Sequence, residues 1–181
     1  MTMENQDEIL DSGNLVKTNV VEEQKIISLK KFIFLSIISF GTYELWWIYK
    51  VWRFYKQKEK LDIMPAARAI FSIFFLNSLF KRNLEFAKKK GYQDSYSSVF
   101  LFIGFFGVNG LSRLPDPFWL ISILSFIFII PPFKALNFAK QNSTDFIVSE
   151  QPSFSGRQIA LIVIGVIIWA LVLMGMIMEE V

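Results

Sequence analysis

The chain has 181 residues, of which 53% are hydrophobic and 20 are Phe, and its formal net charge is +3. It contains neither Cys nor His, which excludes disulfides, thiolate chemistry, Cys or His metal ligands and Ser-His or Cys-His nucleophiles. Its basic residues stand at the ends of apolar runs instead of along one solvated face, which argues against nucleic-acid binding. We therefore expect an integral membrane protein without a cofactor or metal, and we expect no enzyme.

Residues 1–24 are polar and acidic, with Lys17 as their single base. The acids there are Glu4, Asp7, Glu8, Asp11, Glu22 and Glu23. This composition predicts a disordered cytosolic tail, and the absence of a basic start followed by an apolar run argues against a signal peptide. We expect residues 25–181 to form a single helical membrane domain.

The first apolar segment begins after Lys31 and is uncharged from residue 32 to residue 43. Gly41 is the predicted helix break, because glycine adopts conformations that other residues avoid. From Tyr43 onward the spacing predicts an amphipathic helix with two distinct faces. One face holds Trp46, Lys50, Arg53, Gln57 and Lys60, and the other holds Glu44, Ile48, Val51, Trp52 and Tyr55.

Three segments end in the same pattern, an aromatic residue followed by lysine and then by an amphipathic continuation. The pairs are Tyr49-Lys50, Phe80-Lys81 and Phe133-Lys134. Aromatic and basic side chains gather at the headgroup level, so we predict a membrane-interface belt there. It also includes Trp46, Trp47, Trp52 and Arg53. A ligand cage formed by the tryptophans is the alternative.

The second apolar segment, residues 69–80, has only twelve uncharged positions, whereas a membrane span needs about 20. It is therefore a tilted short crossing, a partial insertion, or a helix covered by its neighbours. Residues 95–112 and 117–133 are again uncharged and predict a helical hairpin. Arg113 and Asp116 in its turn are expected to form a local ion pair, with anion binding as the alternative.

Residues 158–178 form the clearest span, 21 residues without a charge, preceded by Arg157. The fold class that we predict is all-α: about three full transmembrane helices plus two shorter or partly inserted amphipathic helices. Because positive flanks mark the cytoplasmic side, we expect a cytoplasmic N-terminus and an external C-terminus. The first apolar segment either crosses the membrane fully or turns back to the cytoplasmic side at Gly41. The second alternative keeps the basic residues that follow it, from Lys50 onward, in the cytoplasm.

The stretch S-I-I-S-F-G-T-Y-E-L-W-W-I-Y-K-V-W, residues 36–52, resembles a family of small bacterial membrane proteins classed as a domain of unknown function. Their signature is S-I-x-T-x-G-x-Y-x-x-Y-W-x-Y-K, from which Ser39 and Trp46 depart. Other stretches of residues 31–175 are similar, among them P-A-A-R-A-I-F-S-I-F-F and R-L-P-D-P-F-W-L-I-S. The resemblance implies a multi-pass protein of the bacterial inner membrane and supplies neither a substrate nor a catalytic residue.

Glu44 is the most unusual residue, because an ionisable group within an apolar segment is costly and is generally paired or functional. We predict a structural ion pair with Arg68. The leading hypothesis is a non-enzymatic scaffold, stress-related or accessory protein at the cytoplasmic leaflet. Its expected partners are the bilayer with its anionic headgroups, and a second copy or another membrane protein. The alternative is a small oligomeric carrier or channel that uses Glu44 in its pathway.

Overall fold

The computed structural model describes residues 23–179. Of these residues, 74% are helical and very few are in strands, so the predicted all-α class is confirmed. The elements in order are β1 (Gln24–Ile26), α2 (Leu29–Ile38), α3 (Thr42–Glu59), α4 (Pro65–Ile70), α5 (Ser72–Lys89), α6 (Ser98–Gly110), η2 (Leu111–Arg113), η3 (Phe118–Ile129), α7 (Ile130–Gln141), β2 (Val148–Glu150) and α8 (Gly156–Glu179).

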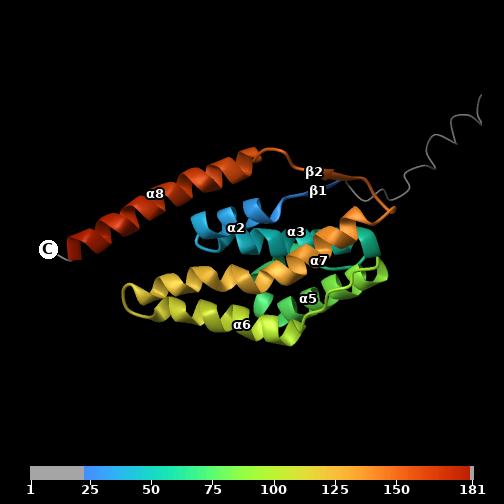
Figure 1. Cartoon of the computed structure of the whole chain (residues 1–181), viewed down its shortest axis with the longest axis horizontal. Coiled ribbons are helices and arrows are strands. Elements are labelled where there is room, and N and C mark those ends of the chain that lie inside the picture. Colours follow the sequence, from blue (N-terminus) through green and yellow to red (C-terminus); the bar gives the residue numbers. More distant parts are fainter. Residues whose placement is uncertain (1–22, 180–181) are drawn as a thin grey trace, which may run out of the picture.

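The helices are arranged along one long axis with two chemically different ends (Figure 1). The C-terminal ends of α3, α5 and α7 lie together beside β1 and β2, at the right of the view. We call this the basic end, because Lys56, Lys58, Lys88, Lys89 and Lys140 occupy the last turns of these helices. The α6–η3 turn and the C-terminal end of α8 lie at the opposite end.

The helix break predicted at Gly41 is confirmed, and it turns the chain back on itself. Phe40 and Gly41 have φ values of 50° and 80°, so both residues are left-handed, and α3 then runs antiparallel to α2 (Figure 1). The left-handed conformation suits glycine, which has no Cβ to clash with the backbone. A continuous crossing by residues 32–52, one of the two alternatives from the sequence, is therefore excluded by the turn.

The two predicted faces of α3 are also observed. Glu44, Ile48, Val51, Trp52 and Tyr55 are all buried, whereas Lys50, Arg53 and Lys60 are exposed. The buried face packs into one core with α2, α4, α5 and α7. The spacing of the apolar residues was sufficient to predict the buried face of α3, because these residues all lie on one side of the helix and face the same neighbouring helices.

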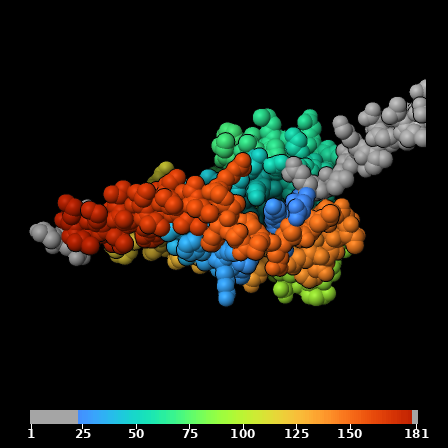
Figure 2. Space-filling model, turned by 90° about the horizontal axis from the view of Figure 1, so that it is seen from above, coloured from blue at the N-terminus to red at the C-terminus, as the bar shows by residue number. Residues whose placement is uncertain are grey.

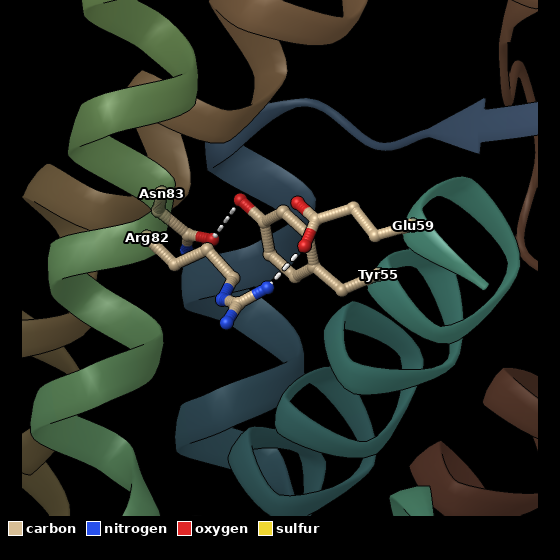
Figure 3. Close-up of polar contacts among 4 residues, drawn as sticks. All are labelled: Tyr55, Glu59, Arg82 and Asn83. Carbon is tan, nitrogen blue, oxygen red and sulfur yellow. Dashed lines mark hydrogen bonds and ion pairs between the residues drawn. The ribbon is translucent and has the colours of Figure 1, made fainter. Parts of the chain in front are cut away.

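The second apolar segment is not one helix. It breaks at Phe71 into α4 and α5, although no glycine or proline lies at the break. Polar contacts join α5 to α3 near the basic end: the Tyr55 hydroxyl donates to Asn83 Oδ1 at 2.9 Å, and Arg82 pairs with Glu59 (Figure 3). Side chains at the break remain outside the core: Ile70, Phe71, Ile73 and Phe74 are all more than half exposed.

Two described helices, not the predicted three, are long and apolar enough to cross a membrane: Phe118–Gln141 and Gly156–Met178. The third candidate, residues 98–113, is shorter because its α-helix begins only at Ser98 and gives way to a 3-10 turn after Gly110. The helix from Phe118 passes through Pro131 and Pro132 without ending. It changes there from 3-10 to α geometry, and proline is tolerated in the first turn that follows.

A parallel pair of short strands, which the sequence did not predict, closes the basic end. Gln24, Lys25 and Ile26 align with Val148, Ser149 and Glu150. Two backbone hydrogen bonds of 2.9 Å extend the pair: the Gln24 N–H donates to the Ile147 carbonyl, and the Gln151 N–H donates to the Ile26 carbonyl. Residues 1–22 of the predicted disordered tail lie outside the described residues, and Gln24, at its expected boundary, belongs to β1.

Helix α8 contacts the rest of the molecule mainly through the α2–α3 hairpin. It lies along the outside of the molecule and extends beyond most of the other helices (Figures 1 and 2). Gly165 faces the backbone of α2 so closely that a Cβ there would lie 2.1 Å from the Ile38 carbonyl oxygen. Trp169 stacks on Phe40 with ring centroids 4.7 Å apart and donates its indole N–H to the Ile37 carbonyl at 3.3 Å.

Candidate functional site: a buried carboxylate and a basic cavity

Glu44 lies in the first turn of α3 and is only 2% exposed. Its partner is Ser125 of η3, whose hydroxyl donates to the two carboxylate oxygens at 3.4 and 3.3 Å. Burial raises the pKa of the Glu44 carboxyl, and the Ser125 hydrogen bond opposes that shift without cancelling it. The site therefore favours the neutral, protonated carboxyl.

The predicted ion pair between Glu44 and Arg68 is wrong. Arg68 lies over the rings of Trp52 and Phe75, with its guanidinium carbon 4.5 and 4.9 Å from their centroids. A lone carboxylate on an apolar face either pairs with a cation or takes up a proton, and we had expected the cation. A buried carboxyl that stays protonated avoids that requirement, and cation–π contacts satisfy the arginine.

The predicted pair between Arg113 and Asp116 is not found in the described part of the chain either. Both residues lie in the exposed α6–η3 turn. There the Asp116 carboxylate accepts a hydrogen bond from the Trp119 indole at 2.5 Å. Since Trp119 follows Asp116 by one helical turn, this local contact replaces the ion pair.

The predicted interface belt divides into two groups. Trp47, Trp52, Phe80 and Phe133 are buried in the core, so for these four the prediction of an exposed belt is wrong. Trp46 and Tyr49 are partly exposed and lie against each other, with ring centroids 5.3 Å apart. The bases of the belt, Lys50, Arg53, Lys81 and Lys134, are all exposed. Apolar composition could not separate the two groups, because a protein core and a lipid surface select the same side chains.

A polar network that the sequence did not indicate joins α8 to the base of the α2–α3 hairpin. Buried Gln158 donates to the Tyr43 hydroxyl at 3.1 Å and accepts from the Gln151 side chain at 2.6 Å. Lys31 donates to the carbonyls of Gln151 and Pro152 at 2.6 and 2.7 Å. These contacts fix the start of α8 beside the start of the hairpin.

A cavity of about 180 Å³ opens near this network, and we call it the basic cavity. It is lined by Glu23, Gln24, Lys25, Lys50, Arg53, Phe54, Gln57 and Lys140. Three separate elements, β1, α3 and α7, thus bring four bases together. Lys50 and Arg53 were expected at a membrane interface, but Lys25 and Lys140 become their neighbours only through the β1–β2 pairing and the return of α7.

The described residues contain no group of three acids that could hold a metal ion, and the chain has no His or Cys to supply other strong ligands. The arrangement instead offers cationic and amide donors, which bind anions.

In comparisons with known proteins, the chain matches no family model, no curated protein sequence and no solved structure.

Proposed function

We propose that this chain is a multi-pass membrane protein that acts without catalysis, as a scaffold or accessory protein at the cytoplasmic leaflet. The observation that carries the proposal is α8, whose apolar side chains project outward over its length; Ile164, Ile167, Leu171 and Met174 are all exposed. A helix that is hydrophobic all round requires an apolar environment, and its 23 candidate residues suffice for a bilayer.

The distribution of charge supports the orientation. The last turns of α3, α5 and α7 carry lysines at one end of the molecule, and cytoplasmic flanks are the ones enriched in Lys and Arg. Arg157 at the start of α8 belongs to the same side, so α8 would leave the cytoplasm and place the C-terminus outside. We extend the proposal to the bacterial inner membrane on the resemblance of residues 36–52 alone.

The α2–α3 hairpin supports partial insertion into one leaflet. The ten residues of α2 rise by about 15 Å, half of a hydrocarbon core of about 30 Å. Backbone inside a bilayer must satisfy its polar groups internally. At the turn, the N–H groups of Phe40, Gly41 and Thr42 donate to the carbonyls of Ile37, Ser36 and Ser39 at 3.0 to 3.3 Å.

The break between α4 and α5 would be a second insertion from the same side. The exposed side chains around the break are all apolar: Ile70, Phe71, Ile73 and Phe74. The opposite, C-terminal end of α5 carries lysines. Two wedges in a single leaflet add volume to that leaflet alone. Added volume in one leaflet is the physical basis on which the protein would shape or sense the cytoplasmic leaflet. Its further partner would be a second copy of the chain or another membrane protein.

The alternative of a carrier or channel rests on the buried Glu44. Its carboxyl is 2% exposed and faces Ser125, and it lines neither the basic cavity nor the two pockets that Tyr43 lines. We therefore rank this alternative second.

Single-cysteine variants test the topology cleanly, since the chain has no cysteine of its own. Leu114→Cys, in the α6–η3 turn, should react with a membrane-impermeant maleimide in intact cells. Gln57→Cys, near the end of α3, should react only after permeabilisation. Equal labelling of both positions in intact cells, or recovery of the chain in the soluble fraction, would overturn the proposal.

A further inference from the structure

Lys140 is the base whose environment in the basic cavity is least typical. It is 8% exposed, lies over the Phe54 ring at 4.4 Å and donates to the Gln24 side-chain oxygen at 3.0 Å. No carboxylate of the described residues forms an ion pair with it. An ammonium group buried against an amide and an aromatic ring, with no ion-pair partner among the described residues, is poorly compensated for its lost hydration.

Its neighbours add positive charge. Lys25 and Lys50 line the basic cavity and also a second space of about 50 Å³ next to it, again with Lys140, and neither pairs with a carboxylate in the described part of the chain. Lys50 is exposed as a residue, but partial desolvation of its ammonium group lowers its pKa, and the positive charges of Arg53, Arg157 and Lys25 lower it further. Such mutual repulsion is relieved when an anion binds among the bases.

Neutral donors surround the same place. Gln24 and Gln57 line the basic cavity, and Asn137, Gln151 and Gln158 line the second space. Among the described residues of the lining, the acid is Glu23, which is exposed. At about 180 Å³ the basic cavity is smaller than the roughly 300–1,000 Å³ of drug-sized ligand sites, so it suits a small polyoxyanion.

We propose that the basic cavity is a binding site for a phosphate group, with Lys140 and Lys50 as its main contacts and Lys25 at its edge. The phosphate can belong to a lipid headgroup or to a soluble phosphate ion, because either presents the same oxygens. The lipid source rests on the proposed membrane location, and the soluble source does not.

The first test measures binding of inorganic phosphate to the full-length protein in a non-ionic detergent, by calorimetry at constant ionic strength. Lys140→Met and Lys50→Met should each weaken binding by about tenfold to a hundredfold, the expected loss of one charge-assisted hydrogen bond. Lys134→Met is the matched control, since Lys134 is exposed on α7 and does not line the cavity. It should leave the dissociation constant unchanged.

The second test uses nanodiscs of phosphatidylcholine with or without phosphatidic acid, whose headgroup is a phosphate monoester. A preference for phosphatidic acid that Lys50→Met abolishes assigns the site to lipid, and phosphate binding in detergent without that preference assigns it to a soluble ion. Both outcomes support the site. The proposal is overturned if wild-type protein binds neither probe, or if Lys134→Met weakens binding as much as Lys50→Met does. Lys50 is exposed, so its variant folds even if Lys140→Met does not.

Discussion

Glu44 and Ser125 are 81 positions apart in the chain, yet the serine hydroxyl lies 3.3 Å from a carboxylate oxygen of Glu44, and both residues are buried. The contact joins the first turn of α3 to the middle of η3. The serine stands where we had expected the Arg68 guanidinium, so the protonation state of this one carboxyl affects how α3 packs against η3.

We expect stability to depend on pH through Glu44. The folded state raises the pKa of this carboxyl, so it binds more protons than the unfolded state. Its favourable contribution is complete below the pKa of a free glutamate, about 4.3, and is lost as the pH rises through the higher folded value. Glu44→Gln should flatten this slope and stabilise the protein at alkaline pH, measured by melting in detergent between pH 5 and 9. Glu85→Gln, at a more exposed glutamate on α5, is the control, and an unchanged slope in Glu44→Gln would contradict the assignment.

Helix α8 should detach from the hairpin when Gly165 gains a side chain. A Cβ at this position would meet the Ile38 carbonyl oxygen, which is backbone and cannot rotate away. Gly165→Ala should therefore destabilise the protein by about 1–3 kcal/mol. Gly175→Ala on the same helix is the matched control, because nothing lies within 4 Å of its Cβ position. Melting temperatures that fall equally for both variants would show that helix α8 does not dock through Gly165.

Gly104 should likewise matter where the other glycines of α6 do not. Of the three glycines of α6, Gly104, Gly107 and Gly110, only Gly104 meets a neighbour, with its Cβ position 2.1 Å from the Phe128 ring. Gly104→Ala should lower stability, and Phe128→Leu should restore part of the loss by making room. Gly107→Ala, on open surface, should raise stability slightly through its better helix propensity. A double variant no more stable than Gly104→Ala would exclude the steric explanation.

The two α3–α5 contacts in Figure 3 should differ in strength. Tyr55 is fully buried, so Tyr55→Phe leaves Asn83 Oδ1 without its donor and should cost about 1–3 kcal/mol. Arg82 and Glu59 are about one-third exposed, and Glu59→Gln should cost at most about 1 kcal/mol. Chemical denaturation of both variants measures the difference. The reverse order would mean that the ion pair, not the buried hydroxyl, holds the two helices together.

Local chemistry was sufficient to predict several elements. The period of α3 marked its buried face, Gly41 marked a turn, and the uncharged run after Arg157 marked α8. Each depends on residues close together in the chain, for which spacing and backbone preference are informative.

Long-range contacts could not be predicted in the same way. Neither glycine nor proline marks the break at Phe71, and the core formed by α3, α5 and α7 encloses Trp47 and Trp52, which composition alone assigned to an interface. The partner of Glu44 and the bases around Lys140 come from segments about 80 to 120 residues away. Of the candidate site, the sequence therefore supplied Lys50 and Arg53 but not the cavity that they line.

The parallel pairing of β1 with β2 has a consequence for synthesis of the chain. Ile26 pairs opposite Glu150, so β1, which precedes α2, has no strand partner until more than one hundred further residues have left the ribosome. At about 5–20 residues per second, that delay is on the order of ten seconds. During this interval α2 and α3 have been synthesised, but β1, at the start of α2, remains unpaired. The β1–β2 pair forms only when the segment that leads into α8 emerges. The segment that leads into α8 thus completes the anchoring of α2.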